Sequence, residues 1–126
     1  MFLVNSQKQL DSGRRMGELQ LFKARFFRAL AHPIRIAILE ELTHGSRRVS
    51  QLQDRLGVGQ SLLSQHLALL RTNGIVTADK EGLSVRYALR DPLVGDLLKV
   101  ARQIFSNQLS SHHGLLRELA REARRP

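Results

Sequence analysis

The sequence predicts a single, mainly α-helical domain that carries one β-hairpin, and three observations predict it. Its 126 residues are enough for one hydrophobic core but too few for two ordinary domains. Apolar residues recur at three- and four-residue steps through most of the chain, which is the helical period. Between residues 75 and 89 the pattern changes to the alternation that is typical of strands.

The first two predicted helices are separated by a proline. Residues 18–31 carry apolar side chains on one face of an amphipathic helix: Leu19, Phe22, Phe26 and Leu30. His32-Pro33 then interrupts the pattern, and because proline suits the first turn of a helix, we expect a second helix from this point to Thr43. Gly45 is a plausible stop for it. Residues 1–17 form an N-terminal arm, either loose or as a short helix.

The next two predicted helices are joined by a short turn. Residues 49–56 predict a third helix that Gly57 closes, and residues 60–73 predict a fourth. On the fourth helix Leu63, Leu67 and Leu70 share the face that we expect to be buried. Two helices joined by a turn of about three or four residues that contains glycine are the sequence form of a helix-turn-helix.

A predicted hairpin follows the helix-turn-helix directly. Residues 75–79 read as one strand, residues 80–82 as a short loop, and residues 83–89 as a second strand with strict alternation. Asp91-Pro92 ends this strand, and residues 93–123 predict a long helix. The predicted fold is therefore mainly α with a two-stranded β-hairpin wing, a winged helix-turn-helix.

The last predicted helix has more apolar surface than one small domain can cover. Its stripe runs over about seven turns through Val94, Leu98, Ala101, Phe105, Leu109, Leu116 and Leu119. Such a stripe favours a partner chain, although its first half can also pack on its own domain. His112 lies on the stripe, and Gly114 is a candidate kink. We therefore assign residues 1–17 to the arm, 18–92 to the winged helix-turn-helix, and 93–126 to a dimerisation helix of the same domain.

The charge balance favours a polyanionic partner. Lys and Arg number 20 against 11 Asp and Glu, a net charge of +9. Residues 42–90, which hold the helix-turn-helix and the hairpin, carry seven basic and three acidic side chains, so duplex DNA is favoured over a membrane surface. The apolar runs are too short for a membrane span, and the N-terminus does not resemble a signal peptide. The expected compartment is the cytoplasm.

The helix-turn-helix predicts where DNA would be read. The N-terminal turn of a recognition helix enters the major groove first, and here it carries Gln60, Ser61, Ser64 and Gln65, short polar side chains able to reach base edges. The other candidate DNA contacts are Arg47, Arg48, His66, Arg71, Lys80 and Arg86. For His66 we favour half-buried packing or a phosphate contact over base reading. For any single basic residue, a solvated surface position is an equally good interpretation.

In these segments the chain resembles the ArsR/SmtB family of bacterial winged-helix repressors. The resemblance covers roughly residues 18–105 and rests on the runs Phe27–Leu39, Gln51-Leu52, Leu56–Val58, Gln60–Leu67, Leu70-Arg71, Asn73–Val76 and Glu81–Leu89. It implies a homodimeric repressor that binds an imperfect inverted repeat near a promoter. It also implies a dimer interface on the first and last helices, which here offer Leu19, Phe22, Phe26, Leu98, Phe105, Leu109, His112 and Leu116.

Departures from the family's pattern concern its sensing sites. The family's arsenic-type site needs a Cys-Val-Cys run where this chain has Arg48-Val49-Ser50, and the sequence contains no cysteine. Its other metal site begins with Asp-X-His, where Asp91 is followed by Pro92 and Leu93. The adjacent His112 and His113 point about 100° apart on a helix and cannot chelate one ion together. We therefore expect no metal and no cofactor; the signal stays open, an unidentified small-molecule effector being one candidate.

Two other classes of function are weighed against a sequence-specific regulator. An enzyme is not expected, because the sequence offers no paired carboxylates at useful spacing, no nucleophile elbow and no phosphate loop. A winged-helix module for nonspecific nucleic-acid packing or for protein interaction is the remaining alternative. Competition between one promoter fragment and random DNA distinguishes it from a specific regulator.

Overall fold

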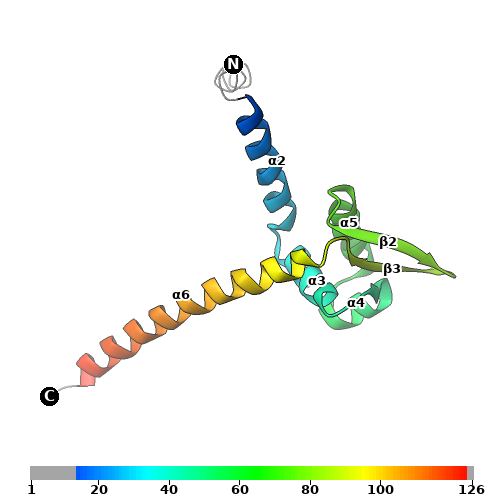
Figure 1. Cartoon of the computed structure of the whole chain (residues 1–126). Helices are drawn as coiled ribbons and strands as arrows, with labels where there is room; N and C mark the ends of the chain where they lie inside the picture. The colour runs from blue at the N-terminus through cyan, green and yellow to red at the C-terminus, as the bar shows by residue number, and fades with distance from the viewer. Residues whose placement is uncertain (1–13, 125–126) are drawn as a thin grey trace.

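The computed structural model describes residues 14–124 of the chain. Its elements follow in the order α2 (Arg14–Leu30), α3 (Pro33–Thr43), β1 (Arg47–Arg48), α4 (Val49–Leu56), α5 (Gln60–Thr72), β2 (Val76–Glu81), β3 (Ser84–Leu89) and α6 (Leu93–Arg124). Figure 1 shows α3, α4, α5 and the hairpin gathered into one body, from which α2 and α6 extend in different directions. The predicted winged helix-turn-helix is confirmed.

The N-terminal helix begins earlier than the sequence pattern predicts. Residues 14–17, assigned above to the arm, form the first turn of α2, and residues 1–13 of the arm lie outside the described residues. The amphipathic pattern misses this turn because it carries no apolar stripe, although Arg and Met are good helix formers. At the other end, the ring of His32 accepts the Ile34 amide at 3.1 Å and caps α3, which Pro33 begins.

The core lies between α3, α4, α5 and the base of the hairpin. Eight side chains in it are almost completely buried: Ile38, Leu39, Leu52, Leu63, Leu67, Leu70, Ile75 and Val76. The predicted inward face of α5 is confirmed, since its three leucines belong to this set. Burial of a leucine side chain contributes about 2 kcal/mol, so these three residues determine which face of α5 remains exposed.

Between α4 and α5 the chain turns at Gly57. This residue has φ +64° and its amide donates to the carbonyl of Gln53 at 2.8 Å, which closes α4. A left-handed conformation costs a residue with a Cβ atom about 1 kcal/mol or more, so glycine is favoured here. Three residues, 57–59, separate the two helices, as a helix-turn-helix requires.

The sheet has three strands among the described residues, where the sequence predicts two. Its order is β1-β3-β2, and both pairings are antiparallel. Two residues, Arg47 and Arg48, form β1 opposite Tyr87 and Arg86, and a strand of two residues is too short to leave a sequence pattern. The short strand ties the chain before α4 to the hairpin.

The hairpin loop is shorter than predicted. Glu81 pairs with Ser84, so Lys80 and Glu81 belong to β2 and the turn contains only Gly82 and Leu83. Gly82 has φ +65°, and a two-residue hairpin turn requires a positive φ of this kind. The expectation that Leu83 belongs to the alternating strand is wrong, because its side chain is fully exposed at the tip. Strand β3 begins at Ser84, and Leu83 continues the alternation only because it lies two residues before Val85.

Helix α6 is anchored to the body only through its first turns. Val94 and Gly95 are buried, and Leu97 and Leu98 pack against the core. Beyond Ala101 every described residue of α6 is exposed, and Figure 1 shows this part projecting away from the body. The helix continues through Gly114. None of the helices within residues 14–124 combines the length and apolarity needed to cross a bilayer.

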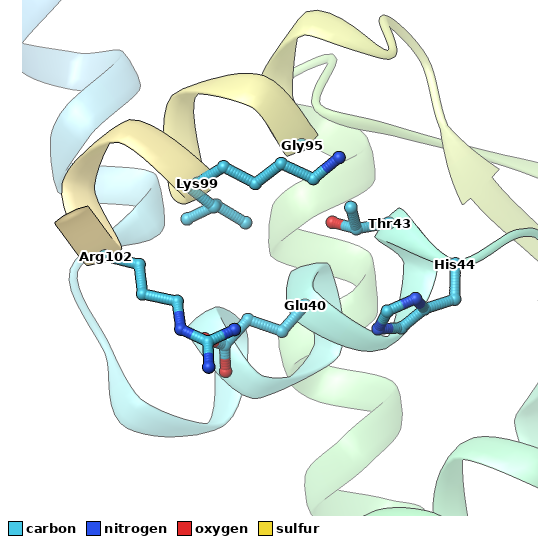
Figure 2. Close-up of a pocket in the computed structure, with 7 residues that line it drawn as sticks. Glu40, Thr43, His44, Gly95, Lys99 and Arg102 are labelled. Atoms are coloured by element: carbon cyan, nitrogen blue, oxygen red, sulfur yellow. The ribbon is translucent and has the colours of Figure 1, made fainter.

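The junction of α6 with α3 depends on the absence of a side chain at Gly95. A Cβ atom there would lie 2.9 Å from Cγ2 of Thr43, and Thr43 is held in place because its hydroxyl donates to the Leu39 carbonyl at 2.8 Å. Figure 2 shows Thr43 facing Gly95 beside a hollow of about 110 Å³ that Glu40, His44, Lys99 and Arg102 also line. The absence of a side chain at Gly95 therefore lets the first turn of α6 pack closely against α3.

Replacement of Gly95 by alanine is therefore expected to destabilise the fold. Overpacking costs about 1–3 kcal/mol, and the better helix propensity of alanine returns up to about 1 kcal/mol, so we expect a net loss of about 1–2 kcal/mol in urea unfolding. Gly114→Ala is the matched control, because nothing lies within 4 Å of its Cβ position and it should gain about 0.5–1 kcal/mol. Equal effects of the two substitutions would show that the Thr43 contact is unimportant.

Candidate nucleic-acid interface

The N-terminal half of α5 presents a polar, exposed face. Gln60, Ser61, Ser64 and Gln65 are all exposed, whereas Leu63, Leu67 and Leu70 of the same helix are buried. Gly59 precedes the helix without a side-chain cap, and its first turn contains no acidic residue. The first amides of a helix lack intrahelical partners and favour an anion such as a DNA phosphate. The face combines exposed polar side chains with a positive helix end that no acidic residue of the first turn compensates.

His66 does not belong to this exposed face. Its ring is half-buried and lies 4.2 Å, centroid to centroid, from the ring of His32. Its Nδ1 atom lies 3.2 Å from NH1 of Arg35, and because a guanidinium can only donate, Nδ1 is the acceptor and must be unprotonated. Of the two interpretations favoured from the sequence, the geometry matches half-buried packing.

The surroundings of His66 keep its ring neutral. Burial, the adjacent His32 and the Arg35 guanidinium, in this order of importance, lower the pKa of His66 below its ordinary value of 6.5. The unfolded chain therefore binds a proton more readily than the folded chain as the pH falls below about 6.5. Stability is unaffected by this group above that pH and is lost progressively as the pH falls toward the folded pKa.

A pH dependence follows from this sign. We expect the free energy of unfolding, measured with urea, to be lower at pH 5.5 than at pH 7.5, and His66→Gln to reduce this difference because glutamine does not titrate. His113→Gln is the control, since His113 is exposed on α6. An unchanged pH difference in His66→Gln would contradict the assignment of the lowered pKa to this site.

Two of the predicted basic DNA contacts lie on the wing, and they differ in their exposure and in their hydrogen bonds. Lys80 is exposed on β2, whereas Arg86 on β3 is already engaged. Its Nε donates to Glu81 at 2.7 Å, and its NH1 donates to the Ser46 hydroxyl at 3.1 Å. The hydrogen bond from Arg86 lowers the pKa of Glu81, and the same bond raises the pKa of Arg86. In this structure Arg86 therefore braces the wing against the start of β1, and Glu81 offsets its charge.

The other predicted basic contacts are spread over the body. Arg48 is exposed at the N-cap of α4, and its Nε lies 4.0 Å from Glu81. Arg47 is half-buried, and its NH1 donates to the Ser46 carbonyl at 3.1 Å. Arg71 lies in the last turn of α5, about 16 Å along the helix axis from Gln60. Arg71 therefore lies apart from the exposed polar side chains in the N-terminal half of α5.

The predicted dimer residues form exposed apolar faces on the two projecting helices. On α2, Phe22 is 66% exposed and Leu19 is 51% exposed, while Phe26 is half-buried against the core. On α6, Leu98 packs on the core, but Phe105, Leu109 and Leu116 are 58%, 60% and 48% exposed. His112 is exposed on the same stripe. Large apolar side chains left in water at this density are typical of an unoccupied protein interface.

Two features of the interface were missed by sequence reasoning. The first is that Ser46 and Glu81 accept hydrogen bonds from Arg86. The second is that Arg35 links two segments: its Nε donates to the Ala29 carbonyl at the end of α2 at 2.7 Å, and its NH1 contacts His66 on α5. Ser46 and Arg86 are 40 residues apart, and Arg35 and His66 are 31 residues apart. No periodicity or spacing carries such a signal. Within residues 14–124, no group of three His, Asp or Glu side chains is placed to hold a metal ion.

The chain is similar to a family of bacterial regulatory proteins and to solved structures of its members. The family model described as bacterial regulatory protein, arsR family, matches residues 32–78. The uncharacterized HTH-type transcriptional regulator Rv0081 of Mycobacterium tuberculosis is 40% identical over 102 residues, which are 80% of this chain and 90% of that protein. Its crystal structure matches with a TM-score of 0.69 at 41% identity and covers 75% of this chain and 95% of that one.

A second solved structure is similar over most of its length. The solution NMR structure of the homodimeric winged helix-turn-helix DNA-binding domain Mb0332 from Mycobacterium bovis matches with a TM-score of 0.70 at 29% identity. The match covers 79% of this chain and 92% of that one. The matched proteins are transcriptional regulators rather than enzymes.

Proposed function

Because the chain belongs to the ArsR family of bacterial regulatory proteins, we propose that it is a homodimeric repressor that binds an imperfect inverted repeat in duplex DNA at a promoter. The coarser statement, a winged helix-turn-helix transcriptional regulator, is established by the relatives. The finer statement concerns the dimer, the operator and the direction of regulation. It rests on the geometry of α5, of the wing and of the two projecting helices.

The observation that carries the proposal is the division of α5 into two faces. Leu63, Leu67 and Leu70 are fully buried, so the rotation of the helix about its axis is determined by the core. The opposite face then presents Ser61, Ser64 and Gln65 outward. A glutamine side chain can pair with adenine through two hydrogen bonds, and serine can donate or accept at any base edge. A rigid helix with such a face can discriminate between base sequences.

The second observation is the pair of apolar faces on α2 and α6. One protomer cannot cover them, whereas a second copy presents the same faces and can cover both in a two-fold arrangement. A two-fold dimer places two copies of α5 on one side of the assembly. The proposed operator therefore consists of two half-sites about one helical turn of DNA apart, near 34–36 Å between centres.

The wing and the body supply contacts to the DNA backbone in this proposal. Lys80 and Arg48 are exposed basic side chains near the hairpin and near the N-cap of α4. Each phosphate neutralised by such a residue strengthens binding to any sequence and makes it more sensitive to salt. Arg86 is assigned a smaller part in DNA binding than its position alone indicates, since Glu81 already holds it.

The experiment that tests the function is a competition gel shift. The purified chain is incubated with fragments upstream of its own gene and of neighbouring genes, in the presence of a large excess of random duplex DNA. We expect one fragment to remain bound, and footprinting of it to show two protected half-sites. Loss of every fragment to the random competitor would favour the alternative, a module for nonspecific nucleic-acid packing.

A further inference from the structure

Three arginines gather around one hollow on the side of the body where α2 meets α5. The hollow has a volume of about 350 Å³, within the range of small-molecule sites. The described residues that line it are Arg25, Arg28, Ala29, Arg35, Leu69 and Asn73. We call this the arginine hollow. It contains three positive charges and, among these six residues, no negative charge.

The three guanidinium groups are not neutralised by carboxylates in the described part of the chain. The ion pairs found among the described side chains join Arg48 and Arg86 to Glu81, and Arg55 to Glu41. Like charges brought together raise each other's electrostatic energy. An anion in the hollow would relieve this repulsion.

One of the three arginines is rigidly positioned. Arg35 donates from Nε to the Ala29 carbonyl at 2.7 Å and from NH2 to the Arg28 carbonyl at 3.4 Å, and its NH1 lies 3.2 Å from Nδ1 of His66. Two of its five N–H groups therefore remain for a ligand. A guanidinium plane that is already oriented loses little side-chain entropy when it binds an oxyanion.

We propose that the arginine hollow binds a small multivalent oxyanion, with its charge on phosphate or carboxylate oxygens. Guanidinium groups match both by paired N–H···O bonds. Leu69, which is exposed, adds apolar surface against which the carbon skeleton of an organic anion can pack. This ligand class follows from charge and shape alone.

The position of the hollow separates it from the proposed DNA-reading face. Leu69 and Asn73 lie at the C-terminal end of α5, so this side of the hollow is about 12–18 Å along the helix axis from the N-terminal turn, while Arg35 on its other side reaches His66. On α2, Arg28 lies about 160° around the helix from Phe26, whereas Arg25 lies about 60° from the proposed dimer residue Phe22. The hollow therefore borders the proposed dimer face on the side of Arg25, while Arg28 points away from that face.

Occupancy of the hollow has a direct route to the recognition helix. Arg35 contacts both the end of α2 and His66 on α5. An anion that binds Arg35 would therefore alter its contact with the helix that is proposed to read DNA. This consequence for repression rests on the proposed function. Binding of the anion itself does not, and the experiment measures it without DNA.

The test uses calorimetry on the full chain with pyrophosphate and, separately, citrate, at constant ionic strength in chloride buffer. We expect at least one of the two anions to bind, and the arm that responds identifies phosphate or carboxylate as the ligand chemistry. We expect Arg25→Gln and Arg28→Gln each to weaken binding about tenfold, the effect of losing one charge-assisted contact.

The matched control is the double variant Arg121→Gln and Arg124→Gln, which removes charge from exposed positions at the far end of α6. It should change the affinity less than twofold. In NMR spectra, addition of pyrophosphate or citrate should shift the resonances of Arg35 Nε–H and of His66, whereas the resonances of residues 110–124 should not change. Binding of neither anion, or equal weakening in the control, would overturn the proposal.

A duplex backbone is the competing occupant. If the hollow contacted DNA phosphates, the combined Arg25→Gln and Arg28→Gln variant would lower the slope of log affinity against log salt for random duplex by about two units. We expect this slope to stay within half a unit of the parent chain. A drop of about two units would assign the arginines to DNA and overturn the small-anion site.

Discussion

Replacement of both Ser64 and Gln65 by alanine is expected to abolish specific operator binding while binding to random DNA stays almost unchanged. Both side chains are exposed on the face of α5 opposite its buried leucines. A good base contact is worth about 1–3 kcal/mol of discrimination, so two such contacts correspond to a loss of about 30-fold to about 20,000-fold in operator affinity. Neither residue carries charge, so the nonspecific term is unaffected.

The measurement is a pair of titrations, one with the operator fragment and one with a scrambled duplex of equal length. Thr72→Ala is the matched control, because Thr72 is exposed at the other end of the same helix and should leave both affinities within about twofold. Thermal unfolding of the double variant should match the parent chain, since both substituted side chains lie in water. An equal loss of affinity for the operator and for the scrambled duplex would show that α5 is not the recognition helix.

Two negative charges on the stripe of α6 are expected to separate the dimer into monomers. In Phe105→Glu with Leu109→Glu, both substituted positions are largely exposed in the single chain, so the fold is retained. In the proposed interface the carboxylates would be buried without partners, and an uncompensated buried charge costs about 3–5 kcal/mol. The dimer dissociation constant should therefore rise by more than a hundredfold.

Sedimentation velocity over a range of concentrations measures this change directly. Operator affinity should fall with it by about 10²–10⁴, because a monomer loses the effective concentration that links the two half-sites. The control is Asn107→Glu with Ser110→Glu, the same added charge on the opposite side of α6 from Phe105, about 140–160° around the helix. If the control dissociates equally, net charge rather than the stripe governs assembly.

Much of the fold could be predicted from the sequence because its helices are amphipathic. The bounds of α3 and α4 agree with the pattern to within a residue, since Pro33 begins one and Gly57 closes the other. The rotation of α5 could also be predicted, since three leucines at helical spacing leave only one way to face a core. The exposed set at its N-terminal turn follows from the same geometry.

Side-chain partners across the fold could not be predicted. Arg86 was expected to face DNA, but β1 brings Ser46 beside it and the hairpin register brings Glu81 beside it. For His66 the sequence favoured half-buried packing or a phosphate contact, but it did not indicate that the neighbours would be His32 and Arg35 at the N-terminal end of α3. A two-residue strand and a contact over 31 residues leave no local pattern.

The sequence by itself therefore determined the order of the elements, the buried face of α5 and the excess apolar surface of α6, because each depends on periodicity within one segment. Only the tertiary structure decided which basic side chains remain available and which are held by partners. It also gathered Arg25, Arg28 and Arg35 around one hollow. Hydrogen bonds and electrostatic interactions act over a few ångströms in space, whatever the distance along the chain, so the packing of segments must be known before they can be assigned.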